Sequence, residues 1–276
     1  MPAVVGAGVV LFFGKNGSVT EFYKRRFLKV FPTAIIVAII YYGIFEKEDS
    51  ILSFLADVLF IGFYKTGKRQ FWYFSLILVL YILYPLIHRF IRPKPSKRLP
   101  ILILSAVLLN VLLFTLVSDY YKVVEIAISR IPIFLVGVWL GVLSKNKAEV
   151  SFVGLMTAAV VLLIGAFSVS YFYPGRMELE RSICGVIGFS MVIVLTVVFH
   201  CLKNGAIKRM FVTVGTYSME LYLLYEKACM ILNGKLIRDR YYFCFYLVVL
   251  TITLMMSVLL KNTVDSLLSV SKKRGS

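Results

Sequence analysis

The chain has 276 residues, of which 60% are hydrophobic and 16% charged, and its formal net charge is +17. Soluble domains carry about 25% charged residues. Apolar runs of about 20 residues recur along this chain, each long enough for a helix to cross a bilayer, and they exclude an ordinary soluble protein. The basic residues lie in short clusters between these runs rather than on an extended basic face, which argues against a nucleic-acid binder.

The apolar runs predict an all-α, polytopic membrane helix bundle of about nine transmembrane helices, in a single domain over residues 1–276. Residues 2–13 form a short first span. Residues 51–64 are too short to cross comfortably and contain Asp57, so we predict a half-inserted or re-entrant piece there and leave the topology of residues 46–70 open. The other predicted spans are 27–45, 71–90, 99–117, 130–144, 151–171, 183–202, 211–232 and 242–261.

The distribution of charge also predicts an orientation. If the segment after residue 13 is cytoplasmic and the spans alternate, 19 of the 31 Lys and Arg residues, but only three of the 14 acids, fall on the cytoplasmic side. Cytoplasmic loops of membrane proteins are enriched in Lys and Arg. We therefore expect a multi-pass protein of the cell membrane with cytoplasmic basic loops and a cytoplasmic C-terminus.

Cysteine spacing predicts neither a metal site nor a disulfide framework. The four cysteines lie in or beside apolar spans without any CxxC pair: Cys184, Cys201, Cys229 and Cys244.

A basic cluster at residues 22–32 runs directly into an apolar span. On a helix, Lys29 is four residues from Arg25 and three from Arg26, so the three cations can share one face at the cytoplasmic surface. Such a face suits a phosphorylated ligand, because Arg binds phosphate oxygens with two parallel hydrogen bonds and Lys adds a point charge. Anchoring to lipid headgroups explains the same cluster, so the residues alone leave both interpretations open.

Two further candidates are ionisable residues associated with spans. Arg130 opens the span 130–144 at the outer face, where snorkelling to the interface and pairing with an acid are both open interpretations. Glu220 lies about ten residues into the span 211–232, and a carboxyl group at that depth is costly unless it faces the bundle interior and finds a partner. Glu220 is therefore the best single functional candidate, with simple packing as its alternative.

Taken in order, four segments resemble the membrane acyltransferase family called acyltransferase family 3. They are FYKRRFLKVFP (22–32), FWYFSLILVLYILYP (71–85), RIPIFLVGVWLG (130–141) and GTYSMELYLLY (215–225). The resemblance implies transfer of an acyl group, usually acetyl, from acyl-CoA to a hydroxyl of a cell-surface or exported glycan or a lipid-linked sugar. Acyl-CoA is then a donor substrate, and no bound cofactor is implied.

The resemblance also implies roles for single residues. The family's basic motif, matched here by Arg25, Arg26 and Lys29, is thought to serve the acyl donor. We assign catalysis to Glu220, with Arg130 as its candidate partner. The family's last segment often ends in His, whereas this chain has Tyr225 at that position.

The family normally begins with one more helix, which carries a His proposed as the catalytic base. The only histidines here, His88 and His200, lie at predicted cytoplasmic helix ends and do not match it. We therefore expect the sequence to be N-terminally incomplete. Loss of a general base typically lowers a rate by about 10²–10⁴-fold, so we expect little acyl transfer from the chain as written.

A second class of function fits the residues as well. A transporter or export component for a lipid-linked polysaccharide is also a polytopic bundle with charges inside the membrane. Membrane lipids are expected contacts for either function, and nucleic acid for neither.

Overall fold

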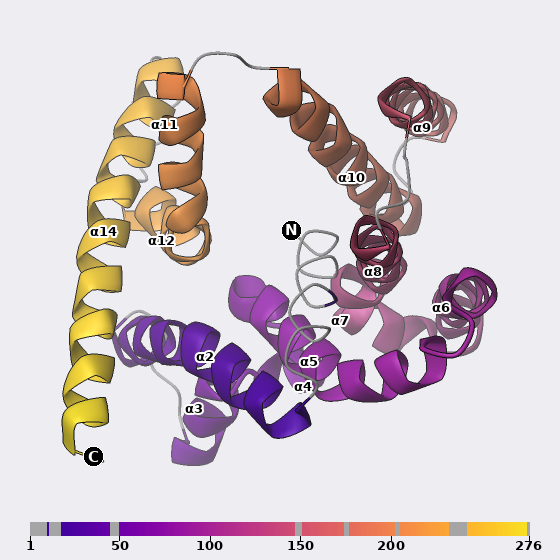
Figure 1. Cartoon of the computed structure of the whole chain (residues 1–276). Coiled ribbons are helices and arrows are strands. Elements are labelled where there is room, and N and C mark those ends of the chain that lie inside the picture. Colours follow the sequence, from indigo (N-terminus) through magenta and orange to yellow (C-terminus); the bar gives the residue numbers. More distant parts are fainter. Residues whose placement is uncertain are drawn as a thin grey trace. The chain divides into compact units, whose positions relative to one another are not determined.

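The computed structural model describes residues 10, 18–44, 50–146, 151–173, 177–201, 205–231 and 242–274, apart from a few side chains within these ranges. Every regular element in them is a helix, and these ranges contain no strand (Figure 1). Seven segments among the described residues are long and apolar enough to cross a membrane: Val19–Gly43, Trp72–Ile91, Pro95–Leu116, Ser118–Leu143, Val153–Phe172, Glu180–Val198 and Cys244–Ser266. The predicted all-α membrane helix bundle is confirmed.

Six predicted spans lie on one long helix each. These helices are α2 (Val19–Ile44), α5 (Trp72–Ile91), α6 (Pro95–Leu116), α9 (Phe152–Phe172), α10 (Met177–Cys201) and α14 (Tyr242–Arg274). Pro95 occupies the first position of α6, where its missing N–H costs little, whereas Pro32 and Pro85 lie inside α2 and α5. The short span predicted at 2–13 lies outside the described residues, except for Val10.

Two predicted spans differ from the structure. The span 130–144 is the second half of a longer one, because α7 (Ser118–Ile128) precedes α8 (Ile131–Lys145) and both fall within the candidate span Ser118–Leu143. The span 211–232 is divided into α11 (Gly205–Thr216) and α12 (Ser218–Ile231), of 12 and 14 residues. A helix needs about 20 residues to cross the hydrocarbon core, so neither crosses alone.

The short apolar segment at 51–64 forms two helices rather than one. The first, α3 (Ile51–Val58), begins where the hydroxyl of Ser50 accepts a hydrogen bond from the amide of Leu52, a typical N-cap. The second, α4 (Gly62–Thr66), is followed by the 3₁₀ turn η1 (Arg69–Phe71). Phe60, between the two helices, has a left-handed φ of 63°, which ends the first helix sharply. Whether this segment enters the membrane stays a prediction.

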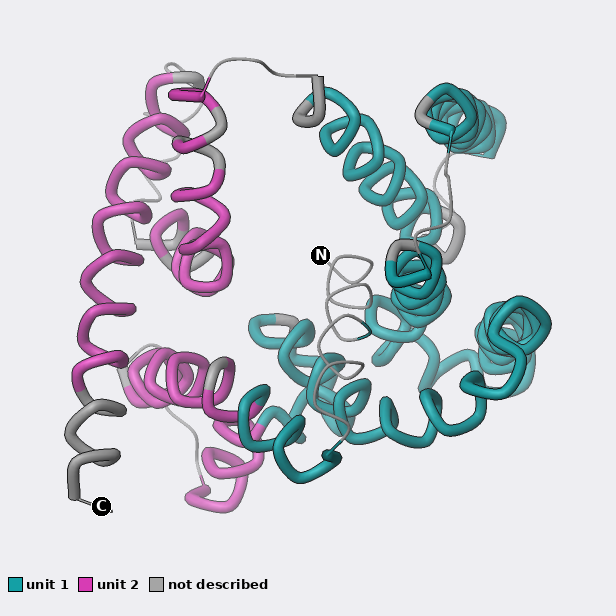
Figure 2. The backbone as a smooth tube through the Cα atoms, in the orientation of Figure 1, with its two compact units in different colours: residues 1–26, 60–201 teal, residues 27–59, 202–276 magenta. Residues whose placement is uncertain are grey.

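The chain divides into two compact units (Figure 2). Unit 1 comprises residues 1–26 and 60–201, and unit 2 comprises residues 27–59 and 202–276. Helix α2 contributes its first turns to unit 1 and the rest of its length to unit 2. The single-domain assignment stays a prediction.

In unit 1, the first turns of α2 pack against α5. The buried ring of Phe22 lies 5.6 Å from the ring of Tyr84 and 6.1 Å from that of Tyr81, measured between centroids. The hydroxyl of Tyr23 donates a hydrogen bond to the carbonyl of Ile82 at 2.9 Å. These contacts hold the basic end of α2 against α5. Elsewhere in unit 1, α9 packs along α10, and α6 contacts both α7 and α8.

Unit 2 is centred on the pair α12 and α14. Ala228 of α12 packs with Phe245 and Val249 of α14 in a buried apolar cluster. Later in α14, Lys261 contacts Thr216, which is the last residue of α11 and lies just before the start of α12. Because the later part of α12 meets the earlier part of α14, the two helices run antiparallel.

Candidate functional site

Arg130 lies in the middle of a candidate span rather than at its outer end. It is the second of the two residues between α7 and α8, after Ser129, and the candidate span runs from Ser118 to Leu143. The prediction that Arg130 opens a span at the outer face is therefore wrong. Three charged residues in 118–128 make this segment unlike a membrane span in sequence. It is nevertheless helical, because its buried acid, Glu125, has a partner on another helix.

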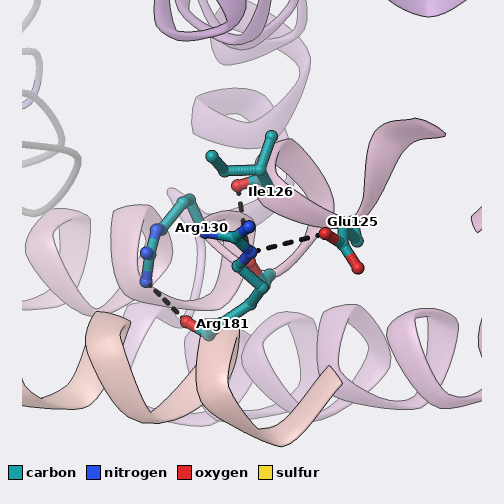
Figure 3. A network of polar contacts seen from close by, with 5 residues as sticks. Glu125, Ile126, Arg130 and Arg181 are labelled. Atoms are coloured by element: carbon teal, nitrogen blue, oxygen red, sulfur yellow. Dashed lines mark hydrogen bonds and ion pairs between the residues drawn. The ribbon is translucent and has the colours of Figure 1, made fainter. Parts of the chain in front are cut away.

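That partner is Arg181 of α10. Its Nε lies 3.3 Å from Oε1 of Glu125, whose side chain is only 4% exposed, whereas that of Arg181 is 31% exposed. Arg130 in turn donates a hydrogen bond from Nη1 to the backbone carbonyl of Arg181 at 3.0 Å (Figure 3). Charged groups inside a membrane bundle normally pair with one another or with backbone carbonyls, and this cluster does both.

We call Glu125, Arg130 and Arg181 the arginine cluster. It contains two guanidinium groups and one carboxylate, so it carries one excess positive charge. Each guanidinium offers five N–H donors and no acceptor. The cluster is therefore chemically suited to bind a negatively charged oxygen, or one that becomes negative during a reaction.

A glycine makes the approach of Arg130 to α10 possible. A Cβ atom at Gly185 would lie 2.1 Å from Nη1 of Arg130 and 2.5 Å from Cδ1 of Ile133. No side chain fits there without displacing one of the two. Gly185 thus gives α10 a gap in which the guanidinium group lies directly against the helix.

The basic cluster at the start of α2 is only partly described. Arg25 is exposed and forms an ion pair with Glu21, one turn earlier on the same helix. Arg26 is half-buried, with its guanidinium carbon 5.8 Å from the centre of the Tyr81 ring. The side chain of Lys29 lies outside the described residues, so the predicted common face of Arg25, Arg26 and Lys29 stays a prediction.

Glu220 lies in the first turn of α12 and is 5% exposed. Its burial agrees with the sequence argument, but its setting differs, because the helix restarts two residues earlier. A carboxylate in a first turn is stabilised by the N-terminal end of the helix dipole. Within the described part of the chain Glu220 has no ion-pair partner. Arg130 belongs to the other unit, and the pairing of Glu220 with Arg130 stays a prediction.

Sequence reasoning missed four residues that complete these sites: Glu125, Arg181, Gly185 and Lys261. Glu125 could have been found, since it is an acid flanked by apolar residues in a segment with helical spacing. The spacing of Arg181 and Gly185, four apart, puts them on one face of α10, which is a weak signal alone. No pattern marks Lys261, because its partners lie 45 positions earlier.

Among the residues that the structure describes, no group of three or more His, Cys, Asp or Glu side chains is placed to hold a metal ion.

Comparison with known families gives one match. A family model described as an acyltransferase domain, of the acyltransferase 3 type, matches residues 4–262 and so covers most of both units. Neither the comparison with curated proteins nor that with solved structures gave a match.

Proposed function

Because this chain belongs to acyltransferase family 3, we propose that it transfers an acyl group, acetyl in the first instance, from acyl-CoA to a hydroxyl of a cell-surface or exported glycan or a lipid-linked sugar. The family match over residues 4–262 carries the proposal. The seven candidate spans support a reaction at the membrane. The same match favours acyl transfer over the alternative of polysaccharide export.

The donor side of this proposal rests on the basic start of α2. The phosphates of CoA are multiply charged, and Arg25 and Arg26 with Lys29 supply cations for them. The exposed guanidinium of Arg25 and the anchoring of Tyr23 and Phe22 to α5 support this assignment, because an anchored helix end loses less entropy when it binds. With basic loops cytoplasmic, the donor enters from the cytoplasm.

The chemistry is an ester-forming acyl transfer. The acceptor oxygen attacks the thioester carbonyl carbon, its proton passes to a base, the C–S bond breaks, and CoA leaves as the thiolate, which takes up a proton. Because neither His88 nor His200 matches the family's proposed base, we assign this proton to Glu220 and expect the transfer to be slow. Arg130 belongs to the other unit, and its guanidinium, which the Arg181 carbonyl holds, is suited to bind a negatively charged oxygen.

Donor binding tests the assignment directly. Replacing Arg26 and Lys29 by Ala should weaken the binding of acetyl-CoA to the purified chain in detergent by about tenfold or more, because each charged hydrogen bond contributes roughly 1.5–3 kcal/mol. Lys94→Ala is the control, because Lys94 is an exposed cation of another basic segment. Unchanged affinity in the double variant removes the donor assignment. An equal loss in the control shows non-specific attraction of charge.

Acyl transfer itself is measured in liposomes as release of the CoA thiol and as radiolabelled acetyl on a methyl glycoside. In cells, loss of glycan acylation with normal export in a deletion strain supports transfer. Accumulation of fully acylated, unexported glycan supports transport instead and contradicts the proposal.

A further inference from the structure

A residue of α14 contacts the break between α11 and α12. Helix α11 ends at Thr216 and α12 begins at Ser218, with Tyr217 between them. The amide of Tyr217 donates to the Val214 carbonyl at 3.1 Å, and its own carbonyl accepts from Leu221 at 2.8 Å. The last carbonyls of a helix lack partners within it and are costly to leave unpaired in lipid.

Lys261 supplies a partner for one of them. Its Nζ donates a hydrogen bond to the Thr216 carbonyl at 2.9 Å and lies 5.0 Å from the centre of the Tyr217 ring. A cation at a helix C-terminus is favoured by the helix dipole, and a cation over an aromatic face adds a further attraction. One ammonium group from α14 thus contacts the two residues that define the break.

The position of the break decides the position of Glu220. This carboxyl group belongs to the third residue of α12, one turn beyond Thr216. Lys261 meets Thr216 at one end of the antiparallel pair, and Val249 packs near Ala228 at the other. Because the helices are antiparallel, four residues forward from Thr216 correspond to four residues back from Lys261. This places Glu220 at the level of Ser257. A shift in the start of α12 would move Glu220 along the contact between α12 and α14.

The nearest hydroxyls of α14 do not compete for Glu220. Thr253 and Ser257 are fully buried on the α14 face that contains Val249 and Lys261. The Thr253 hydroxyl donates to the Val249 carbonyl at 2.6 Å, and the Ser257 hydroxyl donates to the Thr253 carbonyl at 2.7 Å. Their protons are therefore already engaged. Neither of these hydroxyls therefore donates to the Glu220 carboxylate.

We propose that Lys261 is a positioning residue for the acyl-transfer reaction: it fixes the break between α11 and α12 and thereby holds the Glu220 carboxylate where it accepts the acceptor hydroxyl. This role rests on the proposed function for its chemistry, but the positioning of Glu220 by Lys261 can be measured without any turnover.

The first experiment measures the reactivity of Glu220 with dicyclohexylcarbodiimide, an apolar reagent for buried carboxyl groups, by mass spectrometry on the full chain in detergent. Lys261→Met keeps the stem but loses the charge and the donors, and it should raise the labelling rate of Glu220 about fivefold or more, because the Thr216 carbonyl is no longer held and the start of α12, with Glu220, can shift. Lys261→Arg should restore the original rate. Lys122→Met, which removes an exposed lysine of α7, is the control and should have no effect.

The labelling of buried Glu125 in the same samples is an internal reference. A Glu220 rate within twofold of the unmodified chain in Lys261→Met overturns the proposal. So does a parallel rise at Glu125, because it shows general loosening of the fold rather than positioning of one carboxyl group.

The second experiment is a double-mutant cycle on acyl transfer. If Lys261 acts through Glu220, the combined Lys261→Met and Glu220→Gln variant transfers no more slowly than Glu220→Gln alone. The proposal is contradicted if the fold-loss of rate in the combined variant equals the product of the fold-losses in the two single variants. If Glu220→Gln alone transfers as fast as the unmodified chain, the catalytic assignment of Glu220 fails, while the labelling result still decides whether Lys261 positions Glu220.

Discussion

Gly185 and Arg130 are in such close contact that a methyl group at position 185 would lie 2.1 Å from the Nη1 nitrogen of Arg130. The two residues are 55 positions apart in sequence and belong to α10 and to the turn before α8. Their contact is the tightest constraint on the arginine cluster, and it makes the cluster accessible to mutagenesis.

Gly185→Ala should therefore displace Arg130 and lower acyl transfer. The two crowded atoms, Nη1 of Arg130 and Cδ1 of Ile133, are the far ends of flexible side chains that can move aside, so the thermal unfolding temperature in detergent should fall only slightly. The control is Gly188→Ala on the same helix, where a Cβ atom meets nothing within 4 Å. That variant should be neutral or slightly stabilised, because Ala is a better helix former than Gly. If Gly185→Ala and Gly188→Ala have the same acyl-transfer rate and the same thermal unfolding temperature, the close contact of Gly185 with Arg130 is contradicted.

The buried ion pair predicts an asymmetric mutational response. Arg181→Met should destabilise the chain by roughly 3 kcal/mol, because it removes the ion-pair partner of the buried Glu125 carboxylate. Adding Glu125→Gln should recover part of that loss, since a neutral amide then replaces the buried carboxylate. On α7 the exposed pair of Lys122 and Asp119 serves as the comparison, and its removal should change stability by less than about 1 kcal/mol. Additive losses at Arg181 and Glu125 would argue against a paired charge.

Tyr64 predicts a stability change at high pH. Its hydroxyl donates to the Ser75 carbonyl at 2.9 Å, and burial, with a smaller contribution from Tyr120, raises the pKa of Tyr64 to about 12. The unfolded chain releases this proton near pH 10, so stability from this group is complete below pH 10 and is lost as the pH rises toward 12.

Tyr64→Phe should accordingly be less stable than the unmodified chain at pH 9, by about 1 kcal/mol for the lost hydrogen bond. The difference should shrink between pH 10 and 12. Tyr173→Phe, at an exposed position, provides the background. A difference that stays constant over this pH range would show that Tyr64 titrates in the folded chain as it does in the unfolded one.

The predicted orientation can be tested with single cysteines in a background free of the four native ones. Ser96→Cys lies in the basic first turn of α6, and Tyr173→Cys lies directly after α9; both positions are exposed. A membrane-impermeant maleimide should label position 173 in intact spheroplasts and position 96 only in inverted vesicles, because basic loops face the cytoplasm. The reverse pattern would invert the orientation.

The membrane character and most of the spans could be predicted because these properties are local. An apolar run of about 20 residues meets the requirement of the bilayer wherever it packs, so α5, α6, α9 and α14 follow from their own residues. The family resemblance was likewise carried by the order of short segments, and the family match confirms it.

The prediction was wrong where a charge or a break depends on another helix. The predicted spans leave out residues 118–128, where Asp119, Lys122 and Glu125 are unfavourable in lipid when considered alone. The ion pair with Arg181 of α10 offsets most of that cost for Glu125. The span 211–232 was read as continuous because no Pro or charge cluster marks Tyr217, and the residue that holds the break, Lys261, is on α14.

By itself, the sequence determined a helical membrane protein of an acyltransferase family and pointed to Arg130 and Glu220. Only the tertiary structure decided what surrounds them: the gap at Gly185, the ion pair between Glu125 and Arg181, and the contact of Lys261 with the end of α11. The physical reason is range. Hydrophobic length and helix propensity act within one segment, whereas the cost of a buried charge or an unpaired carbonyl is set by groups that other helices bring to it.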